Sequence, residues 1–180
     1  MKTCKVCGTI FTPLRPLQSV CSPKCAMKFA RERKSLERSE VKRRLAALKT
    51  IPQLVKEAQV AFNAFIRERD KDKPCICCGK PLADSGGVGG AGFDCGHYRS
   101  TGSASHLRFH EDNAHGQNKQ CNRYGAGRAV DYRIGLIARI GVERVESLES
   151  DNTPKKWTRE ELIAIREQYR AKLKELRKES

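Results

Sequence analysis

The sequence predicts an α+β fold assembled from small modules. Three observations support this: cysteines recur in closely spaced pairs, two long segments repeat apolar residues at helical spacing, and the residues just before His97 read as a strand. In chain order we expect a four-cysteine module, basic and amphipathic helices, a central module of two strands and a helix, and a C-terminal helix. Their expected ranges are 1–30, 31–72, 73–150 and 151–180.

The overall charge is the first guide to a partner. The chain has 180 residues, enough for one domain or two small ones, of which 38% are hydrophobic and 32% charged. Its net charge is +15 at pH 7. An excess of this size favours a polyanionic partner, most commonly nucleic acid, over the alternatives of a solvated basic surface or a membrane-surface binder.

The compartment follows from two further features. No window approaches the roughly 18 apolar residues of a membrane span, and the start, Met1-Lys2-Thr3-Cys4, has no apolar run of a secretory signal. We therefore expect a reducing cytoplasm, where nine cysteines in Cys-x-x-Cys groups indicate metal more often than disulfides.

The N-terminal cysteines have the spacing of a structural zinc site. Cys4 and Cys7 form one pair and Cys21 and Cys25 the second. A segment this short cannot bury a core, so the metal would supply its folding free energy. Ser22-Pro23 is typical of a helix start, with Ser as N-cap and Pro at the first position. A knuckle, a hairpin and a helix carrying the last cysteine predict a treble-clef-like module.

Residues 26–50 should form one helix that is dense in Lys and Arg, because no Gly or Pro occurs before Pro52. One interpretation is a solvated linker helix with ion pairs four residues apart. The other is an arm that follows DNA phosphates. In the second case the phosphate contacts would come from Arg31, Lys34, Arg38, Lys42 and Arg43.

Three more segments have helical patterns, at 53–69, about 130–148 and 159 to about 178. The last opens with the capping box Thr158-Arg159-Glu160-Glu161. The glycine-rich segment 85–92 lacks the Lys-Ser/Thr that follows in a P-loop, so we interpret it as the tip of a hairpin.

A second zinc site is expected in the central module. Cys75 and Cys78 form its first knuckle and Cys121 its third ligand. The fourth ligand should stand at position 118, where this chain has Asn118, and a neutral amide is a poor zinc ligand. His115, Cys77 or Cys95 are the candidates to replace it, with His115 first, or the site is weakened.

The central module has the order of parts of a zinc-stapled HNH nuclease: Cys-x-x-Cys, then Asp-x-x-His, then an Asn ahead of a Cys-Asn pair. Phosphodiester cleavage needs a base for water and a cation for the phosphate. His97 fits the base, and Asn113 fits the residue that braces the hairpin. Asp94 and Asn122 are the expected oxygen ligands of a catalytic Mg²⁺ or Mn²⁺, and Arg99 joins the DNA-binding candidates.

Nearly the whole chain resembles the NinG family of lambdoid phages, also called Rap. The resemblance rests on the N-terminal cysteine pairs and on the strings FNAFIRERD (62–70), DCGHYR (94–99), LRF (107–109), Tyr132-Arg133, RIG (139–141) and Trp157-Thr158. It implies a recombination endonuclease with an HNH-like centre that cuts branched DNA, including Holliday junctions, in the cytoplasm of the bacterial host. Family members usually carry a cysteine where this chain has Asn118.

Two other classes of function stay open from the residues alone. One is a non-catalytic zinc-finger DNA-binding protein that assists recombination, with Asn118 as the mark of a decayed site. The other is an RNA-binding or ribosome-associated zinc protein. The register of Asp94, His97, Asn113 and Asn122 favours the enzyme. Symmetric cleavage of a junction needs two active sites, which makes a homodimer plausible by function.

Overall fold

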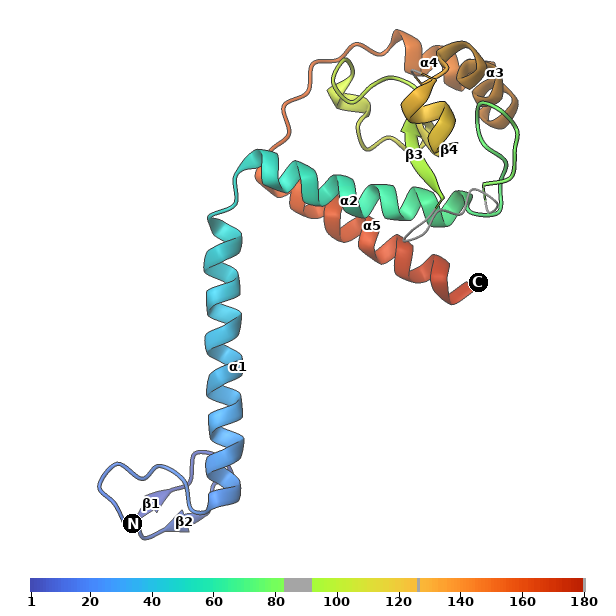
Figure 1. The fold of residues 1–180 in the computed structure, drawn as a ribbon. Helices are drawn as coiled ribbons and strands as arrows, with labels where there is room; N and C mark the ends of the chain where they lie inside the picture. The colour runs from blue at the N-terminus through green and yellow to red at the C-terminus, as the bar shows by residue number, and fades with distance from the viewer. Residues whose placement is uncertain (83–91, 126, 180) are drawn as a thin grey trace. The chain divides into compact units, whose positions relative to one another are not determined.

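The fold is mixed α and β, mostly helical with two small sheets, in a computed structural model that describes residues 1–82, 92–125 and 127–179. The chain divides into two compact units, Met1–Lys49 and Thr50–Ser180 (Figure 1). The glycine-rich segment that we interpreted as a hairpin tip lies, except for Gly92, outside the described residues. None of the helices in the described ranges has the length and apolarity that crossing a membrane requires.

The first unit is a short hairpin followed by a long helix. Strands β1 (Lys2–Thr3) and β2 (Ile10–Phe11) pair antiparallel, and α1 runs from Pro23 to Ala47 (Figure 1). As predicted, the helix begins at Ser22, whose side chain accepts a hydrogen bond from the backbone N–H of Cys25. Helix α1 has no buried residue, so within its own unit it presents its cationic side chains to solvent.

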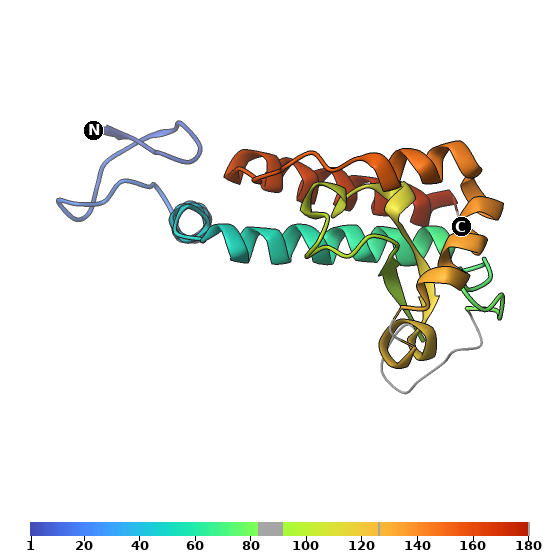
Figure 2. The ribbon, with the colours of Figure 1, turned by 90° about the horizontal axis from the view of Figure 1, so that it is seen from above.

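Two long helices form the base of the second unit. Helices α2 (Ile51–Asp70) and α5 (Arg159–Glu179) lie side by side (Figures 1 and 2). Helix α5 begins with the predicted capping box: Thr158 N donates to Glu161 Oε2 at 2.9 Å, and Glu161 N donates to Thr158 Oγ1 at 3.2 Å. The apolar faces meet in a core that includes Phe62, Leu162 and Tyr169.

A second hairpin packs on α2. Strands β3 (Phe93–His97) and β4 (Ala114–Asn118) pair antiparallel with Cys95 opposite Gly116. The connection between them contains the short turns η1 (Ser105–Leu107) and η2 (Glu111–Asn113). A π-helical turn, η3 (Gln120–Tyr124), follows β4 and carries Cys121. The two strands occur in the expected order, but a five-residue π-helical turn stands where we expected the helix of the central module.

The predicted helix at 130–148 is wrong in one respect, because the structure breaks it in two. Helix α3 spans Ala129–Ile140 and α4 spans Val142–Ser150. Gly141 lies between them at φ 87°, a conformation that glycine adopts without the strain of a side chain. The apolar spacing continues across the break, since Tyr132, Leu136, Val145 and Leu148 share one core cluster.

Candidate functional site

The four N-terminal thiols converge. The sulfur atoms of Cys4, Cys7, Cys21 and Cys25 all lie within 4.8 Å of one another. Hydrogen bonds from backbone N–H groups outweigh desolvation and lower the pKa of Cys4 to about 6, which favours the thiolate that binds zinc. Four thiols at this separation suit a tetrahedral zinc, whose Zn–S bonds are about 2.3 Å long. The donor set therefore fits a structural zinc ion.

A second group of thiols forms beside the hairpin. The sulfurs of Cys75, Cys78 and Cys121 lie within 4.8 Å of one another. A hydrogen bond from the Cys77 thiol, helped by the backbone N–H of Asn118 at 3.2 Å, lowers the pKa of Cys75 to about 4. Such outer contacts orient and stabilise metal ligands. Three soft donors in this arrangement fit zinc with one position left to fill.

None of the expected substitutes fills that position in the part of the chain that the structure describes. The side-chain oxygen of Asn118 accepts the backbone N–H of Gln120 at 2.9 Å. His115, our first candidate, points into a different network beside Arg69, and the prediction that it closes the site is not supported by this placement. Cys77 accepts a hydrogen bond from Gln117 Nε2 at 2.8 Å, and Cys95 is buried in the core against α2.

Two of the predicted catalytic residues meet directly. Asn122 Nδ2 donates to Asp94 Oδ2 at 3.1 Å. Arg123, which the sequence analysis did not single out, donates to both carboxylate oxygens of Asp94 at 2.8 and 3.0 Å. Although partial burial raises it, these two donors lower the pKa of Asp94 overall. The result is an ionised carboxylate with an adjacent amide, a donor pair of the kind that hard divalent ions prefer.

His97 lies apart from that pair. Side chains alternate along a strand, so Asp94 and His97 point to opposite faces of β3, separated by about 10 Å along the strand at about 3.3 Å per residue. The His97 ring is half-buried with its centroid 6.0 Å from that of Phe62, and its Nε2 lies 3.1 Å from the backbone oxygen of Arg108. Burial lowers the pKa of His97, so the imidazole is neutral at pH 7.

Asn113 braces the loop that follows His97. Its side-chain oxygen accepts the backbone N–H of Arg99 at 2.8 Å, and its Nδ2 donates to the carbonyls of Arg99 and Leu107 at 3.0 and 3.1 Å. The side chain is fully buried. The oxygen and the nitrogen of this amide are thus both used to hold the loop, and the role of Asn113 in a nuclease centre stays a prediction.

A buried ion cluster holds the hairpin to α2, and the sequence analysis missed it. Asp70 has no exposed surface and accepts from Arg69 at 2.9 and 2.8 Å, from Lys73 at 2.8 Å and from the backbone N–H of Gly116 at 2.9 Å. His115 Nδ1 lies 3.6 Å from the same carboxylate. The signal was present as an Arg-Asp pair ending an amphipathic helix, but Gly116 and His115, which complete the cluster, lie more than forty residues away.

The DNA-binding candidates separate into two kinds. The five on α1 are all exposed, and Arg43 shares Glu40 with Arg44 in surface ion pairs. Arg99 is different, since its Nη1 donates to the backbone oxygen of Leu148 at 2.8 Å and its Nη2 to Asn152 Oδ1 at 2.7 Å. Arg99 therefore secures the end of α4, and we remove it from the DNA-binding set.

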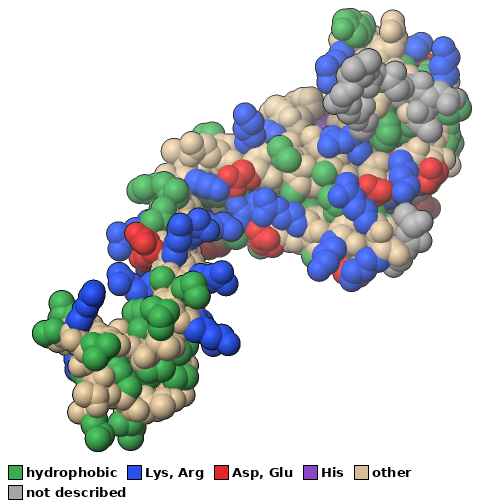
Figure 3. Space-filling model, turned by 60° about the horizontal axis from the view of Figure 1, so that its bottom comes forward, with side chains coloured by type: hydrophobic (Ala, Val, Ile, Leu, Met, Phe, Trp, Pro, Cys, Tyr) green, Lys and Arg blue, Asp and Glu red, His purple; other side chains and the backbone are tan. Residues whose placement is uncertain are grey.

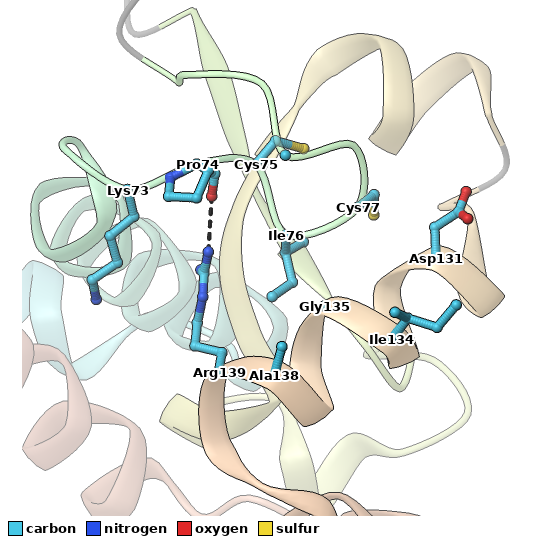
Figure 4. A pocket seen from close by; sticks show the side chains of 11 residues that line it. Lys73, Pro74, Cys75, Ile76, Cys77, Asp131, Ile134, Gly135, Ala138 and Arg139 are labelled. Carbon is cyan, nitrogen blue, oxygen red and sulfur yellow. Dashed lines mark hydrogen bonds between the residues drawn. The ribbon is translucent and has the colours of Figure 1, made fainter.

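A pocket of about 460 Å³ lies between the Cys75–Cys78 knuckle and α3 (Figure 4). Ile76, Ile134 and Ala138 give it an apolar lining, and Arg139 crosses to donate to the backbone oxygen of Pro74 at 2.8 Å. None of the predicted catalytic residues lines it. The pocket is therefore separate from the Asp94–Asn122 pair.

Comparison with known proteins gives one consistent result. The family model described as Bacteriophage Lambda NinG protein matches residues 1–179. Protein ninG of Salmonella phage P22 and that of Escherichia phage lambda are each 42% identical over 95% of this chain and 90% of their own length. Protein ninG of Escherichia phage 933W is 40% identical over 98% of this chain and 94% of its own. No solved structure matches.

Proposed function

This chain belongs to the NinG family of bacteriophage proteins, and from that premise we propose that it is a metal-dependent endonuclease that cuts branched DNA, such as Holliday junctions, in phage recombination. The observation that carries the proposal is the contact between Asp94 and Asn122, which come from a strand and from the helical turn after the hairpin. A carboxylate and an amide meeting at a hairpin–helix junction are suited to a divalent ion.

In this proposal the hairpin residues divide the work. Asp94 and Asn122 would hold Mg²⁺ or Mn²⁺, which would neutralise charge on the scissile phosphate and on the oxygen that leaves when the P–O bond breaks. His97, neutral at pH 7 because burial lowers its pKa, accepts a proton from the attacking water. Asn113 keeps the loop after His97 in place through its hydrogen bonds to Arg99 and Leu107.

The proposal requires one movement on binding DNA. A general base must come within hydrogen-bond reach of its water, and catalytic hydrogen bonds often tighten only in the complex. His97 is the last residue of β3, and its ring is hydrogen-bonded to the backbone of Arg108, with Nε2 3.1 Å from the carbonyl oxygen, and to the backbone of Cys95. Breaking both contacts would free the ring to turn toward a phosphate lying across the end of the strand.

A second candidate function is a non-catalytic DNA-binding protein that assists recombination. It is favoured by Arg123, whose two hydrogen bonds neutralise the Asp94 carboxylate, and by the position of His97 on the opposite face. Asn118, which leaves the central thiol group with three sulfurs, adds to it. In this alternative the two zinc modules and α1 bind DNA, and no bond is broken.

Nicking of supercoiled plasmid separates the two functions. The purified chain is incubated with plasmid in Mg²⁺ or Mn²⁺, and its binding to a four-way junction and to RNA of equal length is measured in parallel. Metal-dependent nicking together with junction binding supports the enzyme. Tight junction binding by a zinc-loaded protein that never nicks supports the accessory protein, and preference for RNA contradicts both.

A further inference from the structure

We propose that the loop Leu14–Leu17, here called the leucine loop, inserts its two leucines beside unstacked bases at a DNA branch point. The inference rests on the proposed function, because it assigns to the N-terminal module the recognition of the branch. Leu14 is 92% exposed and Leu17 is 95% exposed, although both are large apolar side chains. Figure 3 shows hydrophobic side chains gathered over this module, with Lys and Arg beside them.

The leucine loop is held in shape by its own hydrogen bonds. Leu14 N donates to Gln18 Oε1 at 2.8 Å, and Gln18 Nε2 donates to the backbone oxygen of Val20 at 2.9 Å. Lys2 Nζ donates to the backbone oxygen of Pro16 at 2.6 Å. With Pro13 and Pro16 restricting the backbone as well, the two leucines are presented to solvent by a stiff turn. A stiff apolar projection loses little conformational entropy on insertion.

A hollow lies behind the projection. It has a volume of about 570 Å³ and runs between the leucine loop and the start of α1, with Leu14, Leu17 and Val20 as its apolar lining and Arg15 as its charged one. A planar base released from its stack can rest against such an apolar wall. Arg15 is then placed to reach the phosphate of the same nucleotide.

The charge around the loop selects a polyanion as the partner. Residues 1–31 contain no Asp or Glu, while their cations are Lys2, Lys5, Arg15, Lys24, Lys28 and Arg31. Proteins that kink DNA use apolar wedges of Leu, Ile, Phe, Met or Pro beside phosphate-binding cations. A four-way junction or another branch already has interrupted stacking, so a wedge meets less resistance there than in an intact duplex. The loop should therefore favour branched over linear DNA.

The test uses the full chain with Leu14 and Leu17 both changed to Ser, and a matched control with Val60 and Val130 changed to Ser. The control residues are also exposed, at 62% and 75%, but lie outside the module. Binding to a four-way junction and to a linear duplex of equal length is measured over a range of salt. 2-Aminopurine at the branch reports unstacking, and zinc content confirms that the variants are folded.

We expect the leucine variant to bind the junction about tenfold more weakly, the scale of losing the burial of one leucine side chain, with duplex binding and salt slope unchanged. The control should match wild type. Unchanged junction binding, or an equal loss on both DNAs, overturns the inference. Binding to vesicles of anionic lipid is measured as well. If the leucine variant loses binding to the vesicles but keeps its binding to the junction, the loop is a membrane anchor and the inference is overturned. If the wild type binds junctions through the leucines but never cuts them, the proposed endonuclease activity is refuted and this inference still holds.

Discussion

Asp94 and His97 occupy one short strand in very different surroundings. Asp94 is partly exposed and takes hydrogen bonds from Asn122 and Arg123, which lower its pKa. His97 is enclosed by α2 and the loop, which lowers its pKa in turn and leaves the imidazole neutral. Each group is therefore in the protonation state that its proposed role requires, an ionised ligand and a neutral base.

The pH dependence of cleavage tests the role of His97. Since its pKa lies below the usual value of about 6.5, the active neutral form is lost only as the pH falls through that lowered pKa. The cleavage rate should therefore be level at pH 7 and above and decline in acid. A pH–rate profile checks this, with His106→Gln as a control that keeps the profile. A rise centred well above pH 6.5 would assign the base to another group.

Asn118→Cys should complete the central thiol group. The backbone N–H of Asn118 already donates to Cys75 Sγ at 3.2 Å, so position 118 borders the site. A thiolate binds zinc far better than an amide does, and we expect slower zinc loss to a chelator and a higher Tm. Asn118→Ser is the control, since it removes the amide without adding a ligand. Equal zinc retention in both variants would mean that the site is already closed.

At the scale of single residues, the sequence predicted the cysteines of the thiol groups better than it predicted contacts between distant residues. Both thiol groups follow from Cys-x-x-Cys spacing, because a metal site brings its ligands together whatever lies between them. His97 and Asp94 are three residues apart, so strand alternation places their side chains on opposite faces of β3. This could be predicted only once the strand was known to extend to His97. The roles of Arg123 and Asp70 could not be predicted from the sequence, because both depend on contacts with residues distant in the chain.

At the scale of elements, the N-terminal thiol group is placed to hold a metal where its segment is too small to form a core. In the first unit, β1 and β2 are two residues each, and Cys4 is the one side chain of the hairpin segment that is buried. Short strands of this kind are marginal in water without further support. The thiol group that joins the hairpin to the first turn of α1 is the support available.

Removal of zinc should therefore unfold the hairpin of the first unit. A fragment of residues 1–49 corresponds to the first compact unit, and it should bind about one zinc per chain. With a chelator we expect the β1–β2 hairpin to lose its dispersed amide NMR signals. The double change of Cys4 and Cys7 to Ser should reproduce this loss without a chelator. A metal-free fragment with the dispersed spectrum of a folded hairpin would refute a structural zinc.

The hairpin of the second unit depends instead on Asp70. Changing Asp70 to Asn leaves Arg69 largely buried without its charge partner, and breaking a buried ion pair in this way costs about 3–5 kcal/mol of unfolding free energy. Urea unfolding measures the loss. Asp72→Asn, at an exposed position two residues on, should change stability by less than about 0.5 kcal/mol. Equal stability of the two variants would remove Asp70 from the account.

The same carboxylate gives a pH signature. Burial alone raises its pKa, but the hydrogen bonds with His115 and Arg69 lower the pKa of Asp70 well below its usual range. Its contribution to stability is complete above the unfolded pKa of about 3.9 and is lost as the pH falls through the folded pKa. Wild type should lose this contribution in acid, while Asp70→Asn has none to lose.

The order of elements was predictable, and one of their boundaries was not. The cap at Ser22 and the absence of Gly and Pro identified α1, apolar spacing identified α2, and the capping box at Thr158 identified α5. The break at Gly141 was missed because the apolar residues on both sides of it join the same core, so their spacing alone suggested one helix. A glycine inside a helix costs about 1 kcal/mol relative to alanine, so Gly141 was itself a signal that the helix ends there.

At the scale of the whole molecule, the distribution of charge suits the polyanionic partner that we propose. The net charge is +15, and α1 carries many of its cations on a helix without a buried face. Within the described part of the chain, the arginines of α1 form ion pairs only with Glu40. A solvated helix of this kind can follow phosphates without reading bases.

Replacing Arg31, Lys34, Arg38, Lys42 and Arg43 with Gln should weaken binding to branched and linear DNA alike. Each true phosphate contact that is lost should lower the magnitude of the salt slope by about one. The control replaces the same number of cations on α5: Arg170, Lys172, Lys174, Arg177 and Lys178. Equal losses in both variants would mean that only net charge matters. An unchanged slope in the α1 variant would make the helix a spacer.

Cleavage of an end-labelled four-way junction tests the central claim most directly. The initial rate is measured for the purified full chain in Mg²⁺ or Mn²⁺, with a chelator in a parallel reaction and His97→Ala beside wild type. We predict cleavage that the chelator abolishes and that His97→Ala slows by about 10²- to 10⁴-fold, with the junction Kd unchanged. Cleavage by His97→Ala at the wild-type rate, or none by a folded wild type that binds the junction, would contradict the account.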